Sequence, residues 1–135
     1  MTATHFATVT EARKHFSDLI TAAESGRPGT VQRERHRAAV VDAERLRASF
    51  SRLLPANVEA VPEAGGWSIF LTGLPIAADG DTFDSALDEL IDALREYAED
   101  WSDHLRHAPN HEQNWDLVQL VELSTDEQLK EWLQQ

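Results

Sequence analysis

The 135-residue sequence contains no cysteine, which excludes disulfide bonds and thiolate metal sites and fits a cytoplasmic protein. No apolar run approaches the roughly 20 residues that a membrane-spanning helix requires. The first residues also lack the apolar core of a secretory signal. We therefore expect a cytoplasmic protein that does not cross a membrane.

The sequence also lacks the common motifs of enzyme active sites. It contains no Gly-x-Ser-x-Gly nucleophile elbow, no glycine-rich phosphate-binding loop and no His-Glu-x-x-His zinc motif. Ser17, Asp18 and Ser85 stand near histidines, but without such a motif they do not indicate a hydrolase triad. We predict a protein that is not an enzyme and needs no cofactor.

Positive charge is scarce in the whole chain and is concentrated near its start. The formal net charge is -12, from 12 Lys and Arg against 24 Asp and Glu. Up to Leu53, nine basic residues stand against six acidic ones, and the remainder holds three basic and eighteen acidic residues. Because a basic surface favours a polyanion and an acidic surface favours a basic partner, this division predicts two kinds of partner. The alternative for the acidic part is that its charge only maintains solubility.

The chain begins with a predicted strand and one amphipathic helix. Residues 5–9 are short and compatible with a strand. Thr8 or Thr10 can cap the helix that follows, and Gly26 with Pro28 ends it. Apolar residues then recur at the spacing of one buried helical stripe. They are Ala12, Phe16, Leu19, Ile20 and Ala23.

A hairpin and a second helix are expected next. Residues 30–32 and 38–41 are compatible with strands and flank a charged turn at residues 34–37. Asp42 can cap a helix that ends before Pro55. The apolar ridge of this helix consists of Leu46, Phe50 and Leu53. Because such a unit is too small to bury much surface alone, dimerisation is an expected remedy.

The middle of the chain predicts a second hairpin and the strongest helix. Strands are expected at residues 58–61 and 67–72 around a Gly65-Gly66 turn. Asp81 is the expected N-cap of a helix over residues 83–101. Its apolar positions are Phe83, Ala86, Leu87, Leu90, Ile91, Leu94, Tyr97, Ala98 and Trp101. Its opposite, acidic face carries Asp84, Asp88, Glu89, Asp92, Glu96 and Glu99.

The end of the chain has a weaker pattern. Residues 104–114 predict a loop, and residues 117–123 fit either a strand or a helix. Ser124 and Thr125, followed by Glu127 and Gln128, predict a capping box for a last helix. The apolar side of that helix consists of Leu129, Trp132 and Leu133.

Residues 6–46 resemble the Phd/YefM family of antitoxins from type II toxin–antitoxin pairs. The matching features are Thr10-Glu11-Ala12-Arg13 at a helix start, the apolar pair Leu19-Ile20, a glycine stop, and Arg33 followed by Ala38-Ala39-Val40 in a hairpin. His36 departs from the family, which more usually has glycine or another turn former there. The resemblance implies a homodimeric module that binds operator DNA and represses its own operon.

Residues 58–101 are similar to the HicB antitoxin domain. The similarity lies in a hairpin with Gly66-Trp67, a Gly73-Leu74-Pro75 turn, and Gly80-Asp81-Thr82 before a long helix. The resemblance implies a fold like a truncated ribonuclease H without catalytic activity. The enzymatic alternative, a ribonuclease H-like protein, requires metal-dependent cleavage of an RNA–DNA hybrid.

The first resemblance also implies DNA-binding residues. Arg13 matches the arginine of the family's Glu-Ala-Arg motif, and Arg33 matches its hairpin arginine. Lys14 stands beside Arg13 at the expected helix start, where bases and backbone amides can meet phosphate. Arg35 and Arg37 follow Arg33 at two-residue spacing, which predicts a shared face. The alternative is that these side chains are solvated and pair with Glu11, Glu34 and Glu44.

The acidic part supplies the candidate toxin-binding residues. They are Asp84, Asp88, Asp92, Glu96 and Trp132. An acidic helix face suits a basic toxin, because proteins that cut or block RNA bind a polyanion. The alternative is a solvated helix face. His104, His107 and His111 have spacings that zinc accepts, but a polar loop supports ligands poorly, and no metal site is predicted.

Together these patterns predict an α+β protein with a Phd/YefM-like module at residues 1–54 and a HicB-like domain at residues 55–135. The predicted protein is an antitoxin that neutralises a cognate toxin and represses its own operon by binding operator DNA as a homodimer. By family association, the toxin is expected to be a RelE-like ribonuclease. The alternative is a protein-interaction module that does not bind DNA.

Overall fold

The computed structural model describes residues 4–135, which form a mixed α+β structure with six α-helices and two three-stranded sheets. This confirms the predicted fold class. The chain divides into two compact units, the first ending at Ala48 and the second beginning at Ser49. This division falls within a helix, and the predicted boundary of the two modules after residue 54 stays a prediction.

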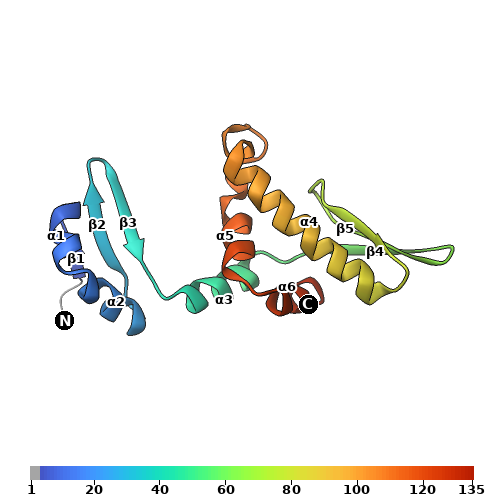
Figure 1. Cartoon of the computed structure of the whole chain (residues 1–135), viewed down its shortest axis with the longest axis horizontal. Coiled ribbons are helices and arrows are strands. Elements are labelled where there is room, and N and C mark those ends of the chain that lie inside the picture. The colour runs from blue at the N-terminus through green and yellow to red at the C-terminus, as the bar shows by residue number, and fades with distance from the viewer. Residues whose placement is uncertain (1–3) are drawn as a thin grey trace. The chain divides into compact units, whose positions relative to one another are not determined.

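The first unit contains one small sheet and two short helices (Figure 1). Its elements are β1 (Thr4–Phe6), α1 (Val9–Lys14), α2 (Phe16–Glu24), β2 (Gly29–Arg33), β3 (His36–Val40) and the start of α3 (Ala43–Leu53). The strand order is β1-β2-β3, with β1 parallel and β3 antiparallel to β2. Both helices pack against β2. The two outer strands, β1 and β3, therefore remain edge strands.

The helix predicted before Gly26 is in fact two helices. The backbone at His15, with φ −123° and ψ 33°, leaves the helical region and separates α1 from α2. Helix α2 buries Leu19, Ala22 and Ala23, whereas Phe16 is 57% exposed and Ile20 is 38% exposed. The predicted burial of Phe16 and Ile20 is wrong, because the buried stripe of α2 is narrower than the apolar pattern indicates.

The caps and stops of the first unit follow the sequence closely. The Thr8 hydroxyl accepts a hydrogen bond from the Glu11 backbone N–H at 3.1 Å, which confirms Thr8 as an N-cap. The Asp42 carboxylate accepts one from the Arg45 N–H at 2.9 Å and caps α3. The hairpin turn is shorter than predicted, because His36 already pairs with Arg33 and only two residues lie between them.

The second unit consists of an antiparallel sheet and a long helix, followed by two 3-10 turns and two shorter helices (Figure 1). Its elements are β4 (Val58–Glu63), β5 (Gly66–Leu71), β6 (Ala77–Gly80), α4 (Phe83–Asp103), the 3-10 turns Leu105–His107 and Glu112–Asn114, α5 (Trp115–Leu123) and α6 (Asp126–Leu133). The strand order is β4-β5-β6. Helix α4 packs on β5 and β6, and α5 and α6 pack on α4.

The second unit differs from the sequence-based expectation in two details, resolves one open alternative and confirms one prediction. Strand β6 was not predicted. The N-cap of α4 is Thr82 rather than Asp81, because the Thr82 and Ser85 side chains form a reciprocal capping box. Residues 115–123 form a helix, which decides between the two predicted states. The predicted capping box of Thr125 and Gln128 before α6 is confirmed.

The main hydrophobic core lies in the second unit. It contains the buried face of α4, two β5 residues and the apolar sides of α5 and α6. Five of its leucines are 0% exposed: Leu87, Leu90, Leu94, Leu120 and Leu129. The first unit buries mainly Ala12, Leu19, Ala22 and Ala23. Within residues 4–135 no helix has the length and apolar character needed to cross a bilayer.

Candidate functional site

The predicted DNA-binding residues form an exposed basic set in the first unit. They are Arg13, Lys14, Arg33, Arg35 and Arg37, and each is exposed. Arg13 and Lys14 lie in the last turn of α1, and the other three lie in the β2–β3 hairpin. We call these five residues the basic set.

Most of the basic set has no intramolecular partner. Lys14 pairs with Glu11 at 3.6 Å between Nζ and the carboxylate, with both side chains more than half exposed. Among the described residues, Arg13, Arg33, Arg35 and Arg37 have no hydrogen bond or ion pair through their side chains. Glu44, one of the expected acidic partners, instead binds Arg47 at 2.6 Å. Pairing with neighbouring acids therefore explains Lys14 only.

The strand register separates the hairpin arginines. Arg33 lies opposite His36, and Gln32 lies opposite Arg37. Directly opposed residues share a face of a sheet and successive residues alternate, so Arg33 and Arg37 point to opposite faces. Arg35 lies in the turn beside Glu34, whose φ is +54°. The predicted shared face of the three arginines is wrong, because the turn lies between them.

The placement of Arg13 and Lys14 also differs from expectation. The sequence suggested that they open a helix, where backbone amides would help to bind phosphate. Because α1 has only six residues and ends at Lys14, both side chains lie in its last turn. Any attraction for phosphate must therefore come from their own charges rather than from the N-terminus of the helix.

Part of the predicted toxin-binding face is used within the second unit. Asp84, Asp88, Asp92 and Glu96 are all exposed on α4. The Lys130 ammonium of α6 lies 2.9 Å from the Asp84 carboxylate and 3.2 Å from that of Asp88. The hydrogen bonds that Lys130 donates, first to Asp84 and then to Asp88, raise its pKa above the usual value. The freely presented part of this face is consequently the stretch with Asp92 and Glu96.

Trp132 has a structural position in the second unit. Its side chain is 3% exposed, and its indole N–H donates to the Leu54 carbonyl at 2.7 Å. It thereby joins α6 to the segment that follows α3. A surface contact of this side chain with a partner would require the core to open, so Trp132 is not available to a toxin in the folded second unit.

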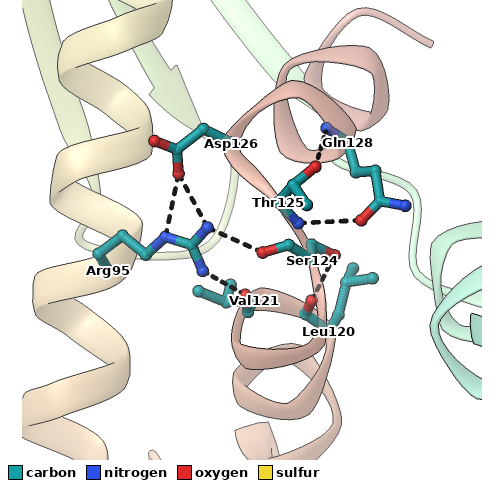
Figure 2. Close-up of polar contacts among 7 residues, drawn as sticks. All are labelled: Arg95, Leu120, Val121, Ser124, Thr125, Asp126 and Gln128. Carbon is teal, nitrogen blue, oxygen red and sulfur yellow. Dashed lines mark hydrogen bonds and ion pairs between the residues drawn. The ribbon is translucent and has the colours of Figure 1, made fainter. Parts of the chain in front are cut away.

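Arg95 on α4 holds the junction between α5 and α6, as Figure 2 shows. Its guanidinium donates to the carbonyls of Val121 and Ser124, the latter at 2.8 Å, and to the Asp126 carboxylate at 2.8 Å. The Ser124 hydroxyl donates to the Leu120 carbonyl at 2.6 Å. Arg95 therefore supplies charged donors to carbonyls at the end of α5 and anchors the first residue of α6.

The three histidines that suggested zinc binding have separate environments. His111 contacts the Tyr97 hydroxyl through Nδ1 at 2.8 Å, and its carbonyl accepts from the Trp101 indole N–H. His104 contacts Asp103 instead. In the described part of the chain, no group of three or more His, Cys, Asp or Glu side chains is arranged to hold a metal ion. The His111 contacts tie the loop after α4 back to that helix.

The first unit exposes apolar side chains that the sequence pattern does not identify. Phe16 and Ile20, which are predicted core residues, are exposed, and so are Val9 at 38% and Val41 at 40%. All four are large apolar residues in a unit whose own core is small. The helical spacing alone does not separate Phe16 and Ile20 from the core, because they continue the apolar stripe of Leu19 and Ala23 within α2.

Comparisons with known proteins agree along nearly the whole chain. Residues 3–134 match the model of the family PHD-like, described as antitoxin of toxin–antitoxin, RelE/RelB, TA system. The fold is similar to the crystal structure of a protein assigned as the antitoxin part of a toxin/antitoxin system in Syntrophomonas wolfei subsp. wolfei. That similarity has a TM-score of 0.78 and 22% sequence identity, and covers 94% of each chain. No curated protein matches the chain.

Proposed function

We propose, from the premise that this chain belongs to the PHD-like family of antitoxins of RelE/RelB toxin–antitoxin systems, that it masks a toxin and represses its own operon as a DNA-bound dimer. Membership of the family makes the chain a non-enzymatic regulatory protein with a cognate toxin as its partner. The rest of the proposal assigns the first unit a Phd/YefM-like role on operator DNA and the second a HicB-like role on the toxin, in the cytoplasm.

The observation that carries the DNA-binding half is the four unpaired arginines of the basic set. Four exposed arginines without intramolecular partners leave their full charge available to phosphate, and this favours binding to a polyanion. Arg33 and Arg37, on opposite faces of the hairpin, suit a strand pair inserted between phosphate backbones better than one flat face. Arg35 at the tip of the hairpin then reaches furthest towards the DNA.

Dimerisation is supported by the exposed apolar residues of the first unit. Val9, Phe16, Ile20 and Val41 expose apolar side chains on a unit that buries few residues larger than alanine. Burying such side chains against a second copy would stabilise the dimer by about 25 cal/mol per Å² of apolar surface. Small domains with marginal cores are commonly stabilised in this way. A dimer also doubles the basic set on the DNA.

Toxin masking is assigned to the second unit by charge. From Ser49 onward the chain has four basic and eighteen acidic residues. A toxin that cuts RNA, such as a RelE-like ribonuclease, needs a basic surface to hold its substrate, and an acidic partner would cover that surface. The predicted contact residues Asp92 and Glu96 are exposed and have no side-chain partner among residues 4–135.

An electrophoretic mobility shift with the protein's own promoter region tests the DNA-binding half. We expect a shift by the full chain at low salt, and a loss of affinity of about 10³-fold or more between 50 and 200 mM salt. Arg33→Ala and Arg35→Ala should each weaken binding, whereas Arg106→Ala, in the second unit, should not. A dimeric protein that shifts no promoter DNA at low salt would instead be an interaction module without DNA binding.

A further inference from the structure

Strand β4 is an uncovered edge of the sheet in the second unit. The strand order β4-β5-β6 leaves β4 with a neighbour on one side only, and α4 packs on β5 and β6. Five of the six β4 residues are exposed. Beyond that, Figure 1 shows the β4–β5 hairpin extending past the helix that covers the sheet. An exposed edge of this length presents backbone groups to solvent, and an extended chain can pair with them.

The ladder identifies which backbone groups point outward. The Thr72 N–H donates to the Asn57 carbonyl at 3.1 Å, and the register continues this pairing through Glu63 opposite Gly66. Pairs alternate between hydrogen-bonded and non-hydrogen-bonded in an antiparallel ladder, so Glu59, Val61 and Glu63 bond to β5. The N–H and C=O groups of Val58 and Ala60 therefore point away from the sheet.

Pro62 agrees with this assignment. It lies opposite Trp67 at a position where the backbone nitrogen faces outward, and there a proline removes no hydrogen bond from the ladder. It also interrupts the outward row, because it presents a carbonyl but no N–H. The open edge thus offers two donors and three acceptors, from Val58, Ala60 and Pro62, to an incoming strand.

The side chains on this strand specify the chemistry of the incoming strand. Glu59, Val61 and Glu63 share the face of the sheet opposite to α4, since Ile69 and Leu71, which lie across from Ala60 and Val58, are buried on the α4 side. Val61 is 45% exposed between the two acids. Cross-strand neighbours of opposite charge stabilise a sheet. The matching strand has basic, apolar and basic side chains at alternating positions.

We propose that β4 is a strand-addition site for the toxin, which pairs a basic extended segment with Val58, Ala60 and Pro62 and sets basic side chains against Glu59 and Glu63. This inference rests on the proposed function, because it takes the toxin as the partner. Charge favours a basic partner over a second copy, since the second unit has four basic against eighteen acidic residues. A second copy would also bring its own Pro62 to the ladder and lose a donor there.

The test compares variants that differ at a single outward N–H. Ala60→Pro removes this donor without touching the ladder to β5, and Ala60→Ser keeps it. The full-length chain and the purified product of the neighbouring gene are mixed, and affinity is measured by calorimetry. We expect Ala60→Pro to bind at least about tenfold more weakly than wild type and Ala60→Ser to bind normally. Slow exchange of the Glu59 and Val61 amides checks that the variant is folded.

A second pair of variants keeps the test decisive if Ala60→Pro does not fold. Glu59→Lys with Glu63→Lys should weaken binding at least about tenfold, whereas Glu122→Lys with Glu131→Lys, an equal charge change on α5 and α6, should not. In the wild-type complex the amides of Val58 and Ala60 should exchange slowly, and in the free chain rapidly.

The outcomes separate the two levels of the proposal. Binding that is equal in wild type, Ala60→Pro and the Glu59/Glu63 variant overturns strand addition and leaves toxin masking intact. If the Ala60 amide of the free chain exchanges slowly, and more slowly at higher protein concentration, the edge pairs with a second copy. That result also overturns strand addition by the toxin. A wild-type chain that does not bind the neighbouring gene product overturns the proposed function itself, and strand addition with it.

Discussion

The Arg95 side chain links three helices of the second unit through polar contacts. It donates to two carbonyls at the end of α5 and to Asp126 at the start of α6 (Figure 2). The Val121 carbonyl also accepts from the Ser124 N–H, so Arg95 adds donors to a helix end that is already partly capped. Because the side chain is 34% exposed, water can replace part of what it provides. Its main effect is to fix the angle of the α5–α6 corner.

Replacing Arg95 should therefore lower stability without changing the fold. We expect Arg95→Met to lower the free energy of unfolding by about 2 kcal/mol, since carbonyls and a carboxylate lose a charged donor. Urea denaturation of both proteins measures the difference. Arg106→Met serves as the control, because Arg106 is exposed and has no side-chain partner among the described residues. If Arg95→Met lowers the free energy of unfolding no more than Arg106→Met does, water replaces the hydrogen bonds that Arg95 donates, and the prediction is contradicted.

Lys130 gives a pH-dependent prediction at the same scale. Its pKa is raised above 10.5 by Asp84 and Asp88, so folding favours the charged form. A raised pKa contributes stability that is complete below the unfolded value and is lost as the pH rises through the folded value. The stability gap between wild type and Lys130→Met should be constant up to about pH 10 and should close above it. Urea midpoints from pH 7 to 11.5 measure this gap, and one that persists at the highest pH contradicts the assignment.

At the scale of elements, the exposed face of α2 is the feature that the sequence pattern misassigned. Phe16 and Ile20 continue the apolar spacing of Ala12 and Leu19, yet the buried stripe of α2 is limited to Leu19, Ala22 and Ala23. Helix α4 behaves in the opposite way. Its twenty-one residues follow one uninterrupted period, and every predicted apolar position from Ala86 to Ala98 is buried.

The same contrast explains which elements could be predicted. Thr8, Asp42 and Thr125 cap helices as expected, because capping depends on a few adjacent residues. Strand β6 was missed because Ala77–Gly80 is short and contains Asp and Gly, which are depleted in strands. A β-carbon on Gly80 would lie 2.4 Å from the Ala86 backbone nitrogen. The position of strand β6 beside α4 is therefore set by tertiary contact rather than by local strand preference.

The α2 face also yields a prediction about assembly. Phe16→Ser should weaken the proposed dimer, because the variant removes apolar surface that this dimer would bury. Analytical ultracentrifugation measures the dissociation constant, which we expect to rise by about tenfold or more. Leu53→Ser is the matched control, since Leu53 is apolar and 74% exposed but lies in the second unit. A wild-type chain that is monomeric at all concentrations would contradict this role of α2.

For the whole molecule, the division of charge was visible in the sequence, whereas the positions of the candidate residues were not. The unpaired state of Arg33 and Arg37, and their opposite faces, follow from the β2–β3 register. The loss of Trp132 to the core and the pairing of Asp84 and Asp88 with Lys130 follow from the packing of α6 on α4. Such long-range contacts join residues that no local pattern connects.

The central claim is that this chain masks a toxin through its acidic unit. Its most direct test is a translation assay in which the purified product of the neighbouring gene is titrated with the full-length chain. We predict that the product blocks protein synthesis alone and that synthesis returns at a fixed molar ratio of chain to toxin. A product that blocks synthesis equally well with the chain in excess would contradict the account.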